Sequence, residues 1–281
     1  MSAARFSLNQ ASIKHGGMED AVRAVVSAGI PAIGAWREPV AEYGLERSAA
    51  LIRDAGLRVS SLCRGGFFTA AEGPARRAAI DDNRAAIAEA HALAAPTLVL
   101  VVGGLPEGSR DMVGARSRVA DAIGELVGEA LDAGVTLGIE ALHPMYAADR
   151  AVVNSLRQAL DLAAPFPAEA VGVVVDTFHL WWDADLASQV ARAGGEGRIV
   201  SYQVCDWLTP IASDPLLSRG YPGDGHIDFE AFTRLVDAAG FAGDIECEIF
   251  NADVWAAPFD EVARTALERY ERLVEPYVER R

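Results

Sequence analysis

The stretch Ala133-Gly134-Val135-Thr136-Leu137-Gly138-Ile139-Glu140 contains the end of an amphipathic run, a glycine, and a short apolar run that closes on a carboxylate. Glycine adopts the left-handed conformation that caps helix ends without a Cβ clash, so Gly134 predicts the end of a helix and the start of a strand. Several such apolar runs do not alternate with polar residues, which is typical of parallel strands buried on both faces. The same joint recurs at Ala28-Gly29-Ile30, Ala55-Gly56-Leu57 and Ala239-Gly240-Phe241.

Apolar runs of this kind recur along the chain with amphipathic runs between them. The predicted strands are Phe6–Leu8, Ala32–Trp36, Val59–Leu62, Thr97–Val102, Thr136–Glu140, Gly172–Asp176, Ile199–Val204 and Asp244–Ile249. The predicted helices include Met18–Ala28, Ala41–Ala55, Ala75–Leu93, Arg110–Ala133, Asn154–Ala163 and Phe229–Ala239. This alternation, at roughly 30 residues per unit, predicts an α/β (β/α)8 TIM barrel that takes residues 1–281 as a single domain. An open doubly wound sheet is the alternative, but it would usually show a glycine-rich phosphate loop, which residues 12–17 do not match.

The charge, the cysteine pattern and the apolar runs of the chain limit which kinds of partner it can have. The chain of 281 residues has 25 Lys+Arg against 40 Asp+Glu, a formal net charge of −15 that repels nucleic acid and anionic lipid. Its 3 cysteines form no CxxC pair, so neither a disulfide framework nor a thiolate zinc site is predicted. The first residues lack the apolar core of a signal peptide, and no apolar run is long enough to cross a bilayer. We therefore expect a cytoplasmic protein that acts on a small molecule, with no nucleic-acid and no membrane partner.

Metal-competent side chains end the last four predicted strands. They are Glu140, Asp176, Gln203 and Glu248. A charge at the inner end of an apolar parallel strand is costly to desolvate unless it is compensated, and no matching Lys or Arg lies in these strands. One such acid alone is more often the N-cap of the next helix, but four strand ends in succession favour a divalent cation. Glu246 faces the same way as Glu248 but one layer deeper, and Asp206 fits a structural role better than a ligand.

The strand-end residues belong to longer motifs. These are Glu140, Asp176-Thr177-Phe178-His179, Tyr202-Gln203-Val204-Cys205-Asp206, Gly223-Asp224-Gly225 and Glu248-Ile249-Phe250-Asn251. Together they resemble the xylose isomerase-like sugar isomerase/epimerase superfamily, which includes tagatose and psicose epimerases, inosose dehydratase and, more distantly, the AP endonucleases. The resemblance covers essentially the whole chain and implies one divalent metal ion held by Glu140, Asp176, Gln203 and Glu248. It also implies that His179 contacts substrate and that Glu140 and Glu248 act as acid and base on either side of a substrate carbon.

Gln203 stands where this superfamily usually has a histidine. The amide makes the predicted site all-oxygen, and a hard site of this kind favours Mn2+ or Mg2+ over Zn2+. It also argues against the AP endonuclease branch, whose multi-metal site is rich in histidine, whereas this chain has 5 His in total. A sugar-binding module with a degenerate site would explain Gln203 as well, but Glu140, Asp176 and Glu248 are all retained.

The predicted function is a metal-dependent isomerase or epimerase of a sugar or keto-sugar. A metal that chelates a carbonyl and a neighbouring hydroxyl would stabilise the enediolate formed when a base removes the adjacent proton. The alternative is a lyase, because Glu140-Ala141-Leu142-His143-Pro144 and residues 145–150 resemble the larger subunit of the C-glycoside deglycosidases. Those enzymes act on 3-oxo-glycosides by β-elimination with a small β-rich partner subunit, and His143 would manage the proton of the leaving aglycone. An exposed loop histidine is the simpler interpretation of His143, and a dehydratase of the same superfamily is a further alternative.

Other residues are weaker candidates for substrate contact. Arg219 lies in Cys205–Ile227, the longest irregular stretch, and loops that follow barrel strands carry function. Trp36 and Arg64 end the second and third strands, and His15 follows the first. A metal-dependent phosphodiesterase would need basic residues clustered at the rim, where only scattered Arg are found. The resemblance also implies an oligomer, either a homo-oligomer or a complex with the small β-rich subunit.

Overall fold

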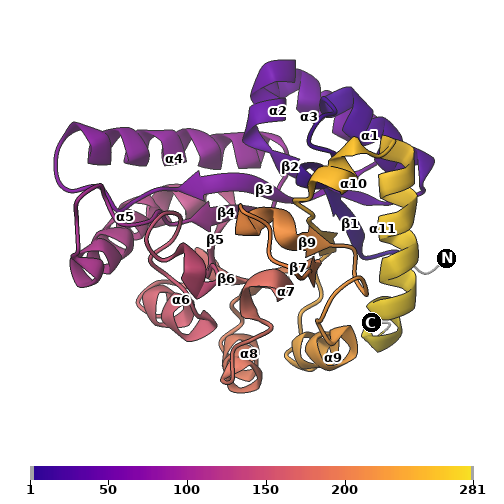
Figure 1. Cartoon of the computed structure of the whole chain (residues 1–281). Helices are drawn as coiled ribbons and strands as arrows, with labels where there is room; N and C mark the ends of the chain where they lie inside the picture. The colour runs from indigo at the N-terminus through magenta and orange to yellow at the C-terminus, as the bar shows by residue number, and fades with distance from the viewer. Residues whose placement is uncertain (1–2, 280–281) are drawn as a thin grey trace.

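Eight parallel strands close into a barrel in the computed structural model, which describes residues 3–279 (Figure 1). The barrel strands are β1 (Phe6–Asn9), β2 (Ala32–Trp36), β3 (Arg58–Gly66), β4 (Thr97–Val101), β5 (Thr136–Glu140), β6 (Val171–Asp176), β7 (Ile199–Val204) and β10 (Ile245–Cys247). Each strand pairs with its predecessor in this series, and β10 pairs with β1 to close the barrel. The predicted (β/α)8 TIM barrel is confirmed.

Helices surround the barrel and connect its strands (Figure 1). They are α1 (Met18–Ser27), α2 (Arg37–Tyr43), α3 (Leu45–Asp54), α4 (Pro74–Ala92), α5 (Met112–Ala133), α6 (Leu156–Ala163), α7 (Thr177–Leu180), α8 (Leu186–Gly195), α9 (Phe229–Ala238), α10 (Ala252–Ala256) and α11 (Phe259–Leu273), with 3-10 turns η1 (Gln10–Ile13), η2 (Pro144–Tyr146), η3 (Pro215–Ser218) and η4 (Glu275–Tyr277). The predicted helix 41–55 is wrong as one element, because Gly44 has a φ of 99° and separates α2 from α3. Within residues 3–279, none of these helices combines the length and the apolar character needed to cross a bilayer. The cytoplasmic location stays a prediction.

The central strands are buried on both faces, as their sequences predicted. Every residue of β6 is buried, and so are Leu137 to Glu140 of β5. Helices cover the outer face with side chains spaced three or four residues apart, such as Ala122, Leu126 and Ala130 of α5. Burial of apolar surface on this scale is the dominant favourable contribution to folding. It also places any ionisable side chain at a strand end in surroundings that disfavour its charged form.

The strand register sets which side chains share a level inside the barrel. Asp176 of β6 pairs with Gln203 of β7, and Gln203 pairs with Glu246 of β10. Paired residues of neighbouring parallel strands point to the same face of a sheet, so these three side chains form one layer. Glu248 lies two residues beyond Glu246 and is therefore one layer nearer the mouth of the barrel, as predicted.

The segment 205–227, predicted to be irregular, contains a two-stranded antiparallel ribbon. β8 (Asp206–Trp207) pairs with β9 (Arg219–Gly220). The buried carboxylate of Asp206 accepts hydrogen bonds of 2.8 to 3.0 Å from the backbone N–H groups of Trp207, Gly223, Gly225 and Ile227. Asp206 thus holds the beginning and the end of the segment together, which is the structural role expected for it. The ribbon brings Arg219 to the carboxyl ends of the strands.

Candidate active site

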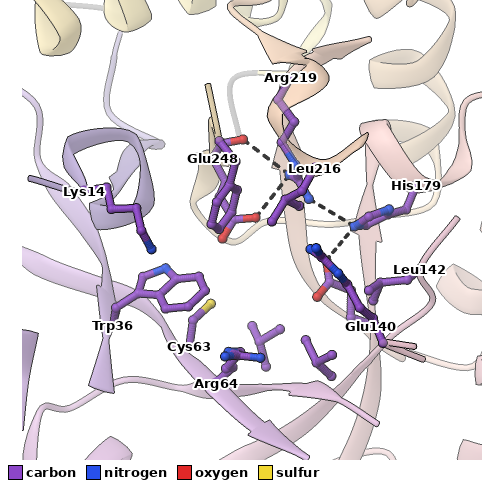
Figure 2. A pocket seen from close by; sticks show the side chains of 14 residues that line it. Lys14, Trp36, Cys63, Arg64, Glu140, Leu142, His179, Leu216, Arg219 and Glu248 are labelled. Carbon is purple, nitrogen blue, oxygen red and sulfur yellow. Dashed lines mark hydrogen bonds and ion pairs between the residues drawn. The ribbon is translucent and has the colours of Figure 1, made fainter. Parts of the chain in front are cut away.

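The carboxyl ends of the barrel strands surround a cavity of about 340 Å³ (Figure 2). Six of the residues predicted from the sequence line it: Trp36, Arg64, Glu140, His179, Arg219 and Glu248. Asp176 and Gln203 are each 1% exposed and belong to the layer beneath the lining. The predicted position of the site, at the ends of the later strands, therefore coincides with a real cavity.

Two carboxyl groups line this cavity, and a third lies directly beneath its lining. Glu140 ends β5, Asp176 ends β6, and Glu248 directly follows β10, and all three are buried. Burial raises the pKa of Glu140 well above its usual value, and the charges of Asp176 and Glu248 raise it further. Burial also raises the pKa of Glu248 to about 8, although Arg219 lowers it in part. The cluster therefore gathers more negative charge than its protein neighbours neutralise, and binding of a proton or a cation relieves that excess.

Arg219 lies at the centre of the cluster rather than at its rim (Figure 2). It is 2% exposed, and its Nη1 donates to Asp176 Oδ2 at 3.0 Å and to Glu248 Oε2 at 3.1 Å. The guanidinium also lies over the rings of Phe178 and Phe250, at 4.6 and 5.3 Å from their centroids. The sequence placed Arg219 among the substrate contacts, but nothing in its loop predicted that it is ion-paired to two of the predicted metal ligands.

His179 is held in one orientation by the backbone of the neighbouring loop. Its Nδ1 lies 3.1 Å from the backbone nitrogen of His143, whose N–H is a donor. Nε2 lies 3.7 Å from Glu140 Oε1 and 3.0 Å from Arg219 Nη2. Burial lowers the pKa of His179 well below its usual value, and the Arg219 charge lowers it further, so the ring is neutral. The backbone N–H of His143 and the guanidinium of Arg219 both donate, and a neutral imidazole has one acceptor nitrogen, so the ring accepts from only one of them at a time.

The side chain of His143 is placed away from the cavity lining. Its ring packs against Trp207 and Trp182, with centroids 4.9 and 5.4 Å apart, and burial lowers its pKa. His143 therefore reaches the site through its backbone N–H, which positions His179. The prediction that the His143 side chain takes part in catalysis gains no support from this geometry.

Gln203 presents its two amide atoms to different surroundings. Its Nε2 donates to Glu246 Oε1 at 3.0 Å, while its Oε1 is buried and has no hydrogen-bond partner within residues 3–279. Glu246 in turn accepts hydrogen bonds from Asn9 Nδ2 at 2.6 Å, from Ser61 at 2.8 Å and from the hydroxyl of Ser60. Because Glu246 accepts hydrogen bonds and donates none when ionised, it fixes the amide with the NH2 group toward itself. The oxygen of Gln203 is left as a free ligand atom.

These donors fit a hard divalent cation. The carboxylates of Glu140, Asp176 and Glu248 and the free oxygen of Gln203 supply oxygen ligands, the set that Mg2+ and Mn2+ prefer. An unpaired buried carbonyl oxygen is costly, and a cation bound at this cluster would satisfy it. Ligand atoms of Glu140, Asp176 and His179 lie within 4.8 Å of one another, as do those of Cys63, Glu246 and Glu248. A cation and the Arg219 guanidinium would compete for the oxygens of Asp176 and Glu248.

The opposite wall of the cavity is basic and aromatic. It contains Trp36 and Arg64, which the sequence predicted, and Lys14, which it missed (Figure 2). His15 was predicted to contact substrate, but it is exposed, does not line the cavity and packs edge-on against Trp255. Its neighbour Lys14 lines the cavity instead, because the turn after η1 directs successive side chains in different directions. Arg150, which pairs with Asp214, also lines the cavity and was missed.

Known proteins resemble this chain over much of its length. A family model described as "Xylose isomerase-like TIM barrel" matches residues 22–273. An inosose isomerase of Bacillus velezensis is 28% identical over 160 residues, which cover 56% of this chain and 55% of that protein. A 3-dehydroshikimate dehydratase of Pseudomonas aeruginosa is 32% identical over 167 residues, which cover 57% of this chain and 24% of that protein. The chain thus matches about half the length of the isomerase and a quarter of the dehydratase.

Two solved structures match the whole fold. The crystal structure of a protein from Sinorhizobium meliloti 1021 is 48% identical, has a TM-score of 0.94, and is matched over 97% of this chain and 99% of its own. The crystal structure of the IOLI protein with a bound zinc atom is 20% identical, has a TM-score of 0.85, and is matched over 98% of this chain and 99% of its own, a likeness that shows the fold alone. Because the family model spans nearly all the chain and the barrel closes as that family requires, this protein belongs to the xylose isomerase-like TIM barrel family.

Proposed function

We propose that this chain is a divalent-metal-dependent isomerase or epimerase that acts on a sugar or keto-sugar by removing a proton next to a carbonyl. The observation that carries the proposal is the pair Glu140 and Glu248, two buried carboxyl groups that line one cavity from different strands. The pKa of each is raised, which brings both groups toward the range where a carboxyl can exchange protons at neutral pH. The relationship to an inosose isomerase supports the same class of reaction.

The two carboxyl groups divide the proton transfer between them. With a pKa of about 8, Glu248 is present in both protonation states near neutral pH. Its ionised form removes the proton from the carbon next to the carbonyl, and the bonding electrons move onto the carbonyl oxygen. Glu140, whose pKa is also raised above its usual value, returns a proton to the opposite face or to the neighbouring carbon. Return to the opposite face gives an epimer. Return to the neighbouring carbon gives an isomer once the proton of the neighbouring hydroxyl has passed to the former carbonyl oxygen.

The residues that would hold the metal are Glu140, Asp176, Gln203 and Glu248. When bound, Mn2+ or Mg2+ would stabilise the negative charge that develops on the substrate oxygens. His179 and the guanidinium of Arg219 line the same region of the cavity. The apolar side chains of Val99, Val101 and Leu142 complete the lining and reduce the access of water.

A dehydratase is the second candidate. The 32% identity to a 3-dehydroshikimate dehydratase favours it, although that match spans 24% of the relative. Its first step is the same proton removal, after which a hydroxyl on the next carbon takes up a proton and leaves as water. Glu140 is placed to supply that proton. The lyase alternative relied on His143, whose ring packs against Trp207 and Trp182 outside the cavity lining.

Hydrogen–deuterium exchange at the substrate tests both candidates. The Mn2+-loaded protein is incubated in D2O with ketoses, an inosose and 3-dehydroshikimate, and the products are followed by NMR. We expect deuterium at the carbon next to the carbonyl, with a new epimer or isomer, or with an unsaturated product if the chain is a dehydratase. Glu248→Gln removes the base and should lower the exchange rate at least about a hundredfold, whereas the exposed Glu268→Gln should not. Absence of exchange on every substrate, together with absence of metal binding, would contradict the proposal.

A further inference from the structure

A second cavity joins the active-site cavity at its basic wall. It measures about 250 Å³ and shares Lys14, Trp36, Arg64 and Phe250 with the first. Figure 2 shows Lys14 and Trp36 on one side of the active-site cavity and Glu140 and His179 on the other. The shared residues therefore form the border between the two cavities, and the second cavity is also lined by Glu38 and Glu42.

Arg64 and Lys14 differ from the other cations of the active-site cavity in having no carboxylate partner. Arg219 pairs with Asp176 and Glu248, and Arg150 pairs with Asp214. The side chain of Arg64 has no ion pair and no hydrogen bond with any other residue in 3–279. Its guanidinium instead lies over Trp36 and Phe67, 5.7 and 4.8 Å from the ring centroids.

Lys14 has the same kind of surroundings. Its Nζ lies 5.9 Å from the ring centroid of Phe250 and 5.6 Å from that of Trp255, and no acid within the described chain pairs with it. Two cations that have no ion pair within the described residues therefore border the same cavity. The aromatic rings cover one side of each cation. The N–H donors of both cations have no side-chain acceptor within the described residues.

A carboxylate is the group that best satisfies these free donors. The half-buried guanidinium of Arg64 presents its donors in a planar fork that matches the two oxygens of a carboxylate, and Lys14 adds a second positive charge. The far wall repels such a group, because Glu140, Asp176 and Glu248 are acidic. The charges of the cavity therefore admit a substrate carboxylate at one end only, and they direct the rest of the molecule toward Glu140 and Glu248.

We propose that the substrate is a polyhydroxylated keto acid, whose carboxylate binds Arg64 and Lys14 while its carbonyl end lies between Glu140 and Glu248. This inference rests on the proposed function and adds the class of substrate. A neutral ketose would leave the donors of Arg64 unfilled. A phosphate monoester carries more negative charge than a carboxylate. Within the described residues, Arg64 and Lys14 are the two side-chain cations that it would meet at the border.

The test compares neutral, carboxylated and phosphorylated ketones. D-fructose, D-fructuronate and D-fructose 6-phosphate share the keto group and differ at C6, and inosose and 3-dehydroshikimate supply a neutral and an acidic cyclic ketone. Dissociation constants are measured by calorimetry and deuterium exchange by NMR, with Mn2+-loaded protein. We expect an acid to bind and exchange at least about tenfold better than its neutral counterpart, and better than the phosphate.

Variants then assign that preference to the two cations. Arg64→Gln and Lys14→Gln should each reduce the preference for the acid over its neutral counterpart to within about threefold, while Arg64→Lys should retain part of that preference. Arg77→Gln, an exposed change on α4 with the same loss of charge, should alter nothing. Because Lys14 is exposed, its variant tests the proposal even if Arg64→Gln is poorly folded.

The outcomes separate this inference from the proposed function. Exchange on neutral ketones without a preference for acids, a preference for the phosphate, or an acid preference that survives in Arg64→Gln and Lys14→Gln would each overturn the keto-acid inference alone. Absence of exchange and of binding for every ligand would overturn the proposed function, and the keto-acid inference with it.

Discussion

Gln203 and Glu246 show how one pair of side chains can set the chemistry of a site. A histidine at position 203 would give the cluster a nitrogen ligand, whereas the amide gives it an oxygen. Glu246 determines which amide atom faces the cluster, because its oxygens already accept hydrogen bonds from Asn9, Ser60 and Ser61 and take one more from Gln203 Nε2. The sequence predicted Gln203 as a ligand, and its free Oε1 agrees with that role, which stays a prediction.

The raised pKa of Glu248 predicts how the stability of the metal-free protein depends on pH. Its pKa is about 8 in the folded protein against 4.5 as the ordinary value, so the folded state holds a proton that the unfolded state has lost. The stability that comes from this proton is complete below pH 4.5 and is lost as the pH rises toward 8. We therefore expect the free energy of unfolding to fall over this range, measured by urea titration with a chelator present.

The contribution of Glu248 is isolated by substitution. Glu248→Gln cannot ionise, so its stability should fall less between pH 5 and 8 than that of the wild-type protein, whereas Glu268→Gln should follow the wild-type curve. Equal slopes for Glu248→Gln and the wild-type protein would show that Glu248 titrates near its ordinary value, and its use as a base at neutral pH would lose its support.

At the scale of elements, local patterns predicted the strands well and the loops poorly. β2, β5 and β7 have the predicted bounds, because a buried parallel strand needs a continuous apolar run that is visible in the sequence. The interruption at Gly44 was missed, since a helical pattern continues across it. The position of Arg219 could not be predicted, because its partners Asp176 and Glu248 are 43 and 29 residues away. Only the closed barrel brings these residues together.

The ribbon of β8 and β9 depends on Asp206. Asp206→Ala would leave four backbone N–H groups without their acceptor, and losing a buried acceptor of this kind costs about 1 to 3 kcal/mol or more. We expect lower stability in urea and faster hydrogen exchange at Gly223, Gly225 and Ile227, with the amides of β6 still protected. The matched control is Asp224→Ala. Asp224 lies in the same turn, but it is exposed and its ion pair is with Arg269. Unchanged protection of the three amides in Asp206→Ala would show that the ribbon is held by other contacts.

At the scale of the whole molecule, the predicted metal ligands come from four neighbouring parts of the barrel wall. Glu140 belongs to β5, Asp176 to β6 and Gln203 to β7, and Glu248 follows β10. These four strands are neighbours in the eight-stranded barrel, so a cation bound to all four residues would connect half of the barrel wall at its carboxyl end. Such an arrangement exists only in the folded chain, and ligand binding is therefore linked to folding.

Metal binding should stabilise the barrel as a whole. A ligand that binds only the folded state adds about 2.7 kcal/mol when its concentration is 100 times its dissociation constant. We expect Mn2+ or Mg2+ to raise the melting temperature of chelator-treated protein, and EDTA to reverse the rise. The shift on adding metal should be largely lost in Asp176→Asn and retained in Glu268→Gln, whatever the melting temperatures of the metal-free variants. If Mn2+ produced the same shift in Asp176→Asn as in the wild-type protein, the cation would bind elsewhere, and Arg219 would be the cation that neutralises Asp176 and Glu248.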